Sequence, residues 1–251
     1  MTTKTPIEVK LMEKVCRLAA ETLSHTAKFV RPGITTDELD RIAYDFTLSH
    51  GALPAPLGYH GFPKSICTSV NDVVCHGVPD GTALKDGDIV NIDVTCLKDG
   101  FHGDTSMTVF VGAPSERAKR IVEQAEQAMY RGIEALMPGG TTGDVGFAVN
   151  KFVTKSGYHV VREIGGHGIG RGFHEEPFVP SFGKKGRGER FRVWGTLTVE
   201  PMINETSSEI IEMPIAGSTI RYYLTADRSL SAQFEHTVLI TDSGYEILTG
   251  R

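Results

Sequence analysis

The sequence is poor in cysteine and has no long apolar run. Its four cysteines form no CxxC pair and are too few for a disulfide scaffold, which favours reduced thiols in a cytoplasmic protein. No apolar stretch is long enough to cross a bilayer, and none follows Lys4 to form a secretory signal. The net charge of -5 gives no reason to expect a nucleic acid or a membrane as partner.

Two parts of the chain have the same residues at the ends and starts of their predicted helices. Pro32 and Thr35 recur as Pro138 and Thr141, each 106 positions later and each with glycine after the proline. In both parts, Pro-Gly ends an amphipathic helix and threonine begins the next. Because Pro-Gly followed by threonine is common at helix ends, coincidence is the alternative. We predict two related halves instead.

The halves cover approximately residues 5–110 and 113–250, and each has two helices followed by strands. They would share one curved antiparallel sheet with helices on its outer face and a cleft between them. The predicted fold is α+β, in a single domain over residues 1–251. Residues 204–222 give no clear register. The predicted strands cover residues 89–97, 101–111, 196–203 and 234–241.

Acidic residues interrupt three otherwise apolar strands, at Asp93, Glu200 and Glu235. Burying a bare carboxylate is costly, and an isolated one usually takes up a proton. An edge strand or an arginine partner would explain any single one of them.

A predicted hairpin places a second acid beside Asp93. With a two-residue Asp-Gly turn, Asp93 faces Ser106 and Thr95 faces Asp104. Asp93 and Asp104 then lie diagonally on one face of the sheet, close enough to share a ligand. No lysine or arginine alternates into that face. A metal is therefore the economical source of positive charge.

A glycine-rich loop adds His167 to Asp93, Asp104, Glu200 and Glu235. Four carboxylates and one imidazole match two divalent ions, with bridging carboxylates holding the ions roughly 3.5–4 Å apart. Hard oxygen ligands with one nitrogen suit manganese, iron or cobalt better than a structural zinc, although zinc is an alternative.

The chain contains, in this order, the motifs Asn91-Ile92-Asp93, Gly103-Asp104, Gly166-His167-Gly168, Thr198-Val199-Glu200 and Gln233-Phe234-Glu235. This series resembles type I methionine aminopeptidases, a class of metallopeptidases that have the pita-bread fold. The resemblance runs from about residue 5 to the C-terminus. It implies a dinuclear-metal hydrolase that removes the initiator methionine from nascent proteins whose second residue is small.

The resemblance also implies a role for each ligand. Asp104 and Glu235 would bridge the ions, Asp93 would chelate one of them, and His167 and Glu200 would complete the other. Glu200 would also carry the proton from the nucleophilic water to the leaving amine.

Further residues match motifs of the family outside the metal centre. His76 would lie near the scissile amide nitrogen, and His174 would hydrogen-bond the substrate carbonyl. The methionine pocket would consist of Tyr59, Phe62, Cys67 and Phe173. A sodium or potassium ion would bind at Asn71, Val73 and Ser231.

One pocket wall departs from the family pattern. Relatives often have tryptophan on the strand before Asp227, where this chain has Arg221-Tyr222-Tyr223 after a longer connection from Glu200. The only tryptophan, Trp194, lies elsewhere in the sequence.

Two alternative functions share this fold: a proline-directed peptidase and a non-catalytic pita-bread binding module. Proline-directed relatives carry a large N-terminal domain, and binding modules usually lose metal ligands. The expected partners are the N-termini of nascent polypeptides, with the ribosome exit region as a further candidate. The chain is expected to be a monomer.

Overall fold

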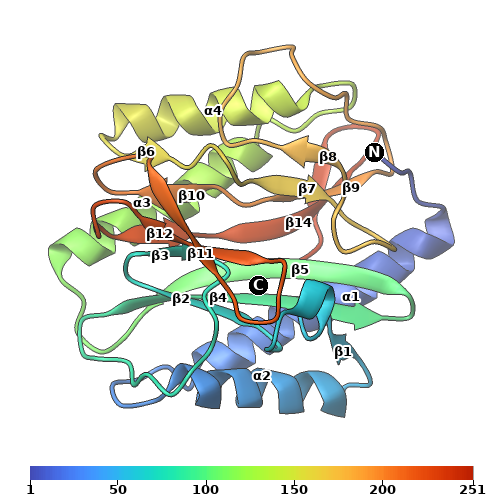
Figure 1. Cartoon of the computed structure of the whole chain (residues 1–251). Helices are drawn as coiled ribbons and strands as arrows, with labels where there is room; N and C mark the ends of the chain where they lie inside the picture. The colour runs from blue at the N-terminus through green and yellow to red at the C-terminus, as the bar shows by residue number, and fades with distance from the viewer. Residues whose placement is uncertain (251) are drawn as a thin grey trace.

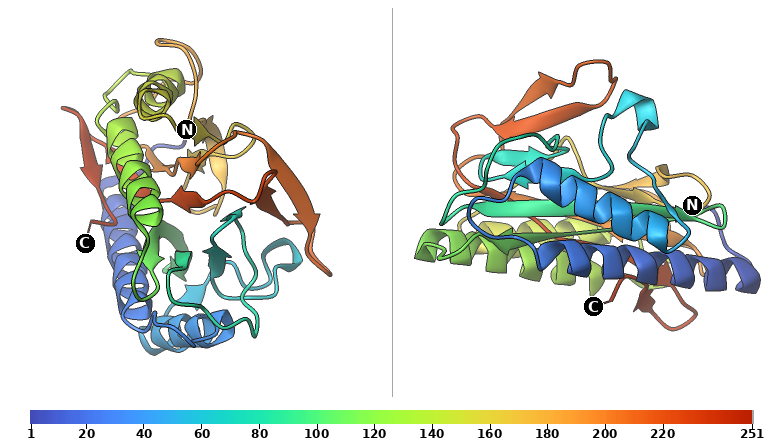
Figure 2. Two further views of the ribbon diagram at one scale, coloured as in Figure 1. Left: turned by 90° about the vertical axis from the view of Figure 1, so that its left-hand side faces the viewer. Right: turned by 90° about the horizontal axis from the view of Figure 1, so that it is seen from below.

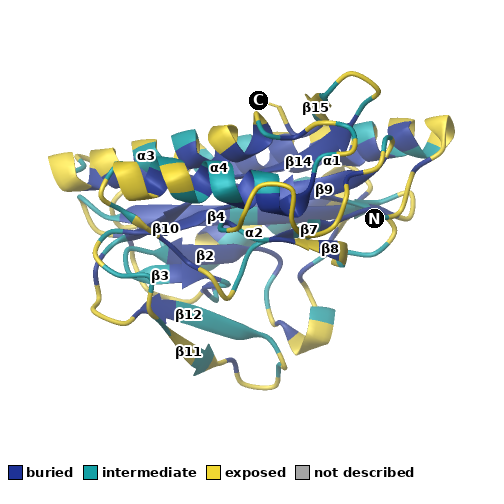
Figure 3. Ribbon diagram, turned by 90° about the horizontal axis from the view of Figure 1, so that it is seen from above, coloured by how far each residue is buried: buried dark blue, intermediate teal, exposed yellow. Residues whose placement is uncertain are grey.

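Helices cover the outer face of a curved antiparallel sheet in the computed structural model, which describes residues 1–250 (Figures 1 and 2). Their inward faces are buried and their outward faces are exposed (Figure 3). Within the described residues no helix is both long and apolar enough to cross a membrane. The α-helices of this part of the chain are α1 Pro6–Ala27, α2 Thr36–Ser49, α3 Glu116–Ile133 and α4 Thr142–Lys155.

The helices α2 and α4 match each other in length and in their start signals. Both helices have 14 residues, and α4 begins and ends 106 positions after α2. Each begins with a capping box, Thr35 with Glu38 and Thr141 with Asp144, in which the acid accepts a hydrogen bond from the backbone of the threonine. The sequence therefore fixes both helix starts locally.

The strands form one large sheet and two small ones. The order of the nine-stranded sheet is β1-β4-β5-β14-β9-β7-β8, with β2 also paired to β4 and β15 to β14. The small sheets are β13-β10-β6 and β11-β12-β3. Strands of the two predicted halves meet where β5 pairs with β14, with Ser106 opposite Glu235.

The bounds of the strands are β1 Leu53–Pro54, β2 Cys67–Val70, β3 Val73–Cys75, β4 Ile89–Lys98, β5 Phe101–Phe110, β6 His159–Val160, β7 Gly166–Gly168, β8 Glu175–Val179, β9 Thr196–Val199, β10 Met202–Asn204, β11 Ile210–Pro214, β12 Arg221–Thr225, β13 Ser231–Gln233, β14 Glu235–Ile240 and β15 Tyr245–Ile247. A short 3-10 helix, η1 Tyr59–Gly61, precedes β2.

The predicted register of the β4–β5 hairpin is confirmed. Asp93 is opposite Ser106 and Thr95 is opposite Asp104. The turn residues Asp99 and Gly100 both have positive φ, as a two-residue turn of this kind requires.

The prediction of one strand over residues 196–203 is wrong. The segment divides into β9, which pairs with β14 and β7, and β10, which pairs with β13 and β6 in another sheet. Glu200 and Pro201 lie between them, and proline has no N–H with which to continue a ladder. The break places Glu200 at the junction of two sheets rather than within a strand.

Close packing of α1 on β5 supports the centre of the sheet. A Cβ atom on Gly103 would lie 2.7 Å from the backbone nitrogen of Cys16, so only glycine lets the helix approach this closely. The neighbouring Asp104 is consequently buried, with only 4% of its surface exposed.

Candidate metal centre

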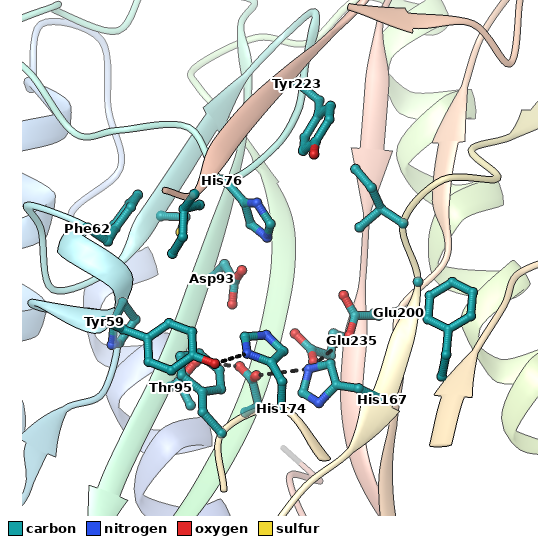
Figure 4. Close-up of a pocket in the computed structure, with 18 of the residues that line it drawn as sticks. Tyr59, Phe62, His76, Asp93, Thr95, His167, His174, Glu200, Tyr223 and Glu235 are labelled. Carbon is teal, nitrogen blue, oxygen red and sulfur yellow. Dashed lines mark hydrogen bonds and ion pairs between the residues drawn. The ribbon is translucent and has the colours of Figure 1, made fainter. Parts of the chain in front are cut away.

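A cavity of about 330 Å³ opens between strands of the two halves (Figure 4). All five predicted metal ligands line it, as do the predicted catalytic histidines and the four predicted pocket residues. These residues are Asp93, Asp104, His167, Glu200, Glu235, His76, His174, Tyr59, Phe62, Cys67 and Phe173. The predicted monovalent-cation residues Asn71, Val73 and Ser231 lie outside it.

Different strands supply the five acid and imidazole groups. Asp93 lies on β4 and Asp104 on the adjacent β5. Glu235 is the first residue of β14, His167 lies on β7, and Glu200 directly follows β9. Since the sheet is curved, side chains from these strands converge in its concavity (Figure 4).

Three of these side chains already have metal-ligand spacing. One ligand atom each of Asp104, His167 and Glu235 lie within 4.8 Å of one another. His167 Nε2 is also 3.5 Å from Glu200 Oε1 and 3.9 Å from Asp104 Oδ2. Among the described residues that line the cavity, none is a lysine or an arginine. The donor set therefore fits divalent cations better than an internal ion pair.

The tautomer of His167 suits a metal ligand. Its Nδ1 donates to the backbone carbonyl of Gly168 at 2.9 Å, because a carbonyl oxygen only accepts. Nε2 then carries the lone pair and faces the carboxylates of Asp104 and Glu200. A hydrogen bond at the other ring nitrogen is the usual way in which proteins orient a metal-binding histidine.

Burial disfavours negative charge on the clustered acids. It raises the pKa of Asp93 to about 7 and that of Glu200 to about 8. The pKa of Asp104 lies well above its ordinary value because of burial and then the charges of Asp93 and Glu200. Burial also lowers the pKa of His167 to about 4, so the imidazole is neutral at neutral pH. Without a cation, these groups are electrostatically strained.

Hydroxyl and amide groups orient two of the acids. Thr95 Oγ1 donates to Asp104 Oδ1 at 2.7 Å, and Thr198 Oγ1 donates to Glu200 Oε1 at 2.7 Å. The side-chain amide of Gln233 donates to the other oxygen of Glu200 at 3.2 Å. Sequence reasoning did not assign these supporting residues, although the predicted pairing of Thr95 with Asp104 was a signal for the first of them.

Two further histidines face the cavity, and each has one fixed ring nitrogen. His76 Nδ1 donates to the carbonyl of Arg221 at 3.0 Å, while His174 Nδ1 lies 2.9 Å from the hydroxyl of Tyr59. Burial lowers the pKa of His76, and burial followed by the proximity of His167 lowers the pKa of His174 to about 3. Both rings are therefore neutral groups able to donate or accept one hydrogen bond.

The β11–β12 hairpin supplies the wall that the sequence left undefined. Tyr223, from the segment that the sequence placed at this wall, lines the cavity, as do Ile220 and Ile164, which were not predicted. Tyr222 packs instead against the buried cluster that contains Phe62 and Cys67. Hairpin residues had no readable register in the sequence, so no pattern marked which tyrosine faces inward.

Two other sequence features lie away from the cavity. Trp194 is 40% exposed, and its carbonyl accepts a hydrogen bond from the backbone of Lys4. The backbone of Ser231 donates to the carbonyl of Asn71 at 2.8 Å, so two of the residues predicted to bind a monovalent cation are neighbours.

Comparisons with known proteins agree with this geometry. The pattern of metallopeptidase family M24 matches residues 10–242. The chain is 49% identical to methionine aminopeptidase A of Synechocystis sp. over 243 residues, which is 96% of this chain and 94% of that protein. The crystal structure of methionine aminopeptidase from Rickettsia prowazekii superposes with a TM-score of 0.96 at 45% identity, covering 100% of both chains.

The pita-bread fold expected from the motifs is confirmed by this similarity. The prolidase from Pyrococcus horikoshii shares the fold at 22% identity with a TM-score of 0.78, but the chain covers only 63% of it. Sequence identity and coverage thus favour the methionine aminopeptidases over the proline-directed peptidases. The chain belongs to metallopeptidase family M24 and, within it, to the methionine aminopeptidases.

Proposed function

We propose that the chain, as a single catalytic domain over residues 1–251, removes the initiator methionine from proteins whose second residue is small. The observation that carries this proposal is the cluster of four acids and one neutral imidazole in a cavity that no lysine or arginine lines among the described residues. An apolar wall beside the cluster, including Phe62 and Cys67, offers the surface that a thioether side chain needs.

The proposed ligand set would hold two divalent cations, and Asp104 and Glu235 would contribute to both sites. Asp93 would contribute to one site, and His167 with Glu200 would contribute to the other. Manganese, iron or cobalt fits these donors best, with zinc as the further candidate. When bound, such ions act as Lewis acids that make a water nucleophilic at neutral pH and polarise the scissile carbonyl.

Protein groups then bind the substrate and move the proton. The first side chain packs against Tyr59, Phe62, Cys67 and Phe173. Glu200 would take a proton from the attacking water and return it to the leaving amine.

The two neutral histidines contact the scissile amide. With Tyr59 donating to Nδ1 of His174, the Nε2–H of that ring is free to hydrogen-bond the carbonyl oxygen. His76, whose Nδ1 is occupied by the carbonyl of Arg221, accepts through Nε2 near the amide nitrogen.

A sodium or potassium ion near Asn71, Val73 and Ser231 is a further part of the proposal. Buried side-chain oxygens of Ser229, Ser231 and Asn204 beside this segment have no hydrogen-bond partner. Asn204 is directly opposite Ser231 in the sheet. Such oxygens are the ligands that a hard monovalent cation takes.

The proposed partners are the N-termini of nascent polypeptides, with the ribosome exit region as a candidate docking partner. We also propose that the chain acts as a monomer in the cytoplasm, whose reducing conditions suit its four free, buried cysteines.

Metal removal and replacement test the proposed function directly. Protein stripped of metal should release no methionine from Met-Ala-Ser, and adding manganese, iron or cobalt singly should restore release. An Xaa-Pro peptide should be a poor substrate under the same conditions. Faster cleavage of the Xaa-Pro peptide would favour the proline-directed alternative.

Replacing His174 with alanine should slow methionine release roughly 10²–10³-fold, the usual effect of losing one donor to the developing oxyanion. Metal content, measured by elemental analysis, should not change, because His174 lies outside the five proposed ligands. His159→Ala, at an exposed position on β6, is the matched control and should keep full activity. Unchanged turnover in His174→Ala would remove this residue from the mechanism.

A further inference from the structure

The β11–β12 hairpin projects from the body of the molecule (Figures 2 and 3). It belongs to the small β11-β12-β3 sheet. Only two residue pairs, Tyr223 with Cys75 and Leu224 with Val73, join it to β3. The backbone of Thr225 also donates to the carbonyl of Asp72 at 2.9 Å, so the base of the hairpin is held and the position of its far end depends on what the tip contacts.

The tip rests on the η1 segment through backbone contacts. Ser218 Oγ and the backbone N–H of Thr219 both donate to the carbonyl of His60, at 2.9 and 3.0 Å. A Cβ atom on Gly61 would lie only 2.3 Å from the carbonyl oxygen of Gly217. The two backbones thus meet with no space for a side chain.

Apolar side chains fill the space below these contacts. Ile215, just past the end of β11, is 7% exposed and shares a buried cluster with Phe62 and Cys67. Ile220 and Tyr222 of the same hairpin pack against that cluster. The hairpin consequently forms the back of the wall on which the proposed methionine pocket rests.

The same hairpin reaches both histidines that face the cavity. The carbonyl of Arg221, at the start of β12, accepts the hydrogen bond from His76. Just before Arg221, the tip contacts η1, in which Tyr59 bonds to His174 (Figure 4). One element therefore connects the supports of two groups on different sides of the cavity.

We infer that the β11–β12 hairpin, through the contact of its tip with η1, sets the width of the pocket for the substrate's first side chain. This inference rests on the proposed function and names the element behind its specificity. Ile215, Gly217 and Ser218 act as positioning residues, because none of them lines the cavity. With the tip seated, the pocket fits an unbranched apolar side chain, and with the tip displaced, it also accepts a bulkier one.

Gly61→Ala tests the inference against a control in the same loop. Gly58 and Gly61 both have positive φ, at 80° and 82°, so alanine strains the backbone similarly at either site. At Gly58, however, the new Cβ atom meets nothing within 4 Å. Only Gly61→Ala should therefore push the hairpin away from η1. Ser218→Ala, which removes one donor to His60, is a milder second variant.

The expected result for Gly61→Ala is a roughly tenfold loss of preference for Met-Ala-Ser over Phe-Ala-Ser, the usual value of a lost apolar contact in a pocket. The loss should appear as a raised KM for the methionine peptide, with a smaller change in kcat. Ser218→Ala should shift the preference in the same direction, and Gly58→Ala should match the unaltered protein.

Hydrogen exchange of the metal-free proteins provides a readout that needs no activity. The amides of residues 210–225 should exchange faster in Gly61→Ala than in Gly58→Ala. Equal specificity and equal exchange in the two glycine variants would overturn the inference. A failure of the proposed function can be told apart from a failure of this inference. In that case the unaltered, metal-loaded protein would release no methionine. The difference in hydrogen exchange between the two glycine variants would still report on the hairpin.

Discussion

Asp104→Asn is expected to lower methionine release on the order of 10⁴-fold, the scale seen when a central catalytic group is removed. Asparagine preserves the shape of the side chain but removes one negative charge. Asp104 shares metal-ligand spacing with His167 and Glu235, so the lost charge falls at the centre of the proposed dinuclear site. Both metal content and activity should therefore fall together.

The measurement is metal content by elemental analysis, followed by turnover of Met-Ala-Ser at saturating manganese. Asp99→Asn is the matched control, because it makes the same chemical change in the same hairpin at an exposed turn residue with positive φ, which asparagine tolerates. That variant should keep two metals and full activity. Two bound metals with normal turnover in Asp104→Asn would contradict a bridging role for this residue.

The second large effect concerns the stability of the metal-free protein, which is expected to fall as pH rises above about 6.5. Burial raises the pKa of Asp93 to about 7 and of Glu200 to about 8, whereas a carboxyl group in the unfolded chain titrates near 4. Between these values the folded state binds more protons than the unfolded state. Stability is therefore lost as pH rises through 7 and 8.

The buried histidines change the folding stability in the opposite direction at lower pH. Burial lowers the pKa of His167 to about 4 and of His174 to about 3, so folding opposes their protonation and stability falls as pH drops below about 6.5. Above that pH the unfolded histidines are already neutral. The window from about pH 6.5 to about 8 therefore isolates the carboxyl groups.

We expect the free energy of unfolding to fall by roughly 2–4 kcal/mol across this window in chelator-treated protein. Urea titration at each pH measures it. Saturating manganese should abolish the decrease, since bound cations stabilise the ionised acids. Glu200→Gln removes one of the titrating groups and should reduce the slope. A flat profile without metal would show that the acids are not strained by burial.

Local rules explain why much of the fold was predictable. Thr35 and Thr141 each begin a helix through a capping box, which depends only on residues three positions apart. An Asp-Gly turn fixed the register of β4 against β5, and that register brought Asp93 and Asp104 to one face. Both inferences involve residues that are close in the sequence, and sequence patterns are informative about such contacts.

Local rules failed where distant segments decide the structure. The apolar run around Glu200 was expected to be one strand, yet it divides because β9 and β10 pair with different partners. The hairpin at residues 210–225 has no periodic pattern, and its place is set by distant contacts such as that of Ser218 with His60, 158 positions earlier. The sequence placed Arg221-Tyr222-Tyr223 at the pocket wall but did not indicate that Tyr223 is the residue that faces inward.

By itself the sequence determined the helix starts, the β4–β5 register and the presence of acids that a buried surface does not tolerate without cations. Only the tertiary structure decided which strands meet, and hence that His167 faces Asp104 and Glu200 and that Tyr223 and Ile220 line the cavity. The physical reason is the separation along the sequence of the residues that interact. Helix caps and tight turns form between residues that are a few positions apart. A pocket wall forms by packing between segments that are far apart in the sequence.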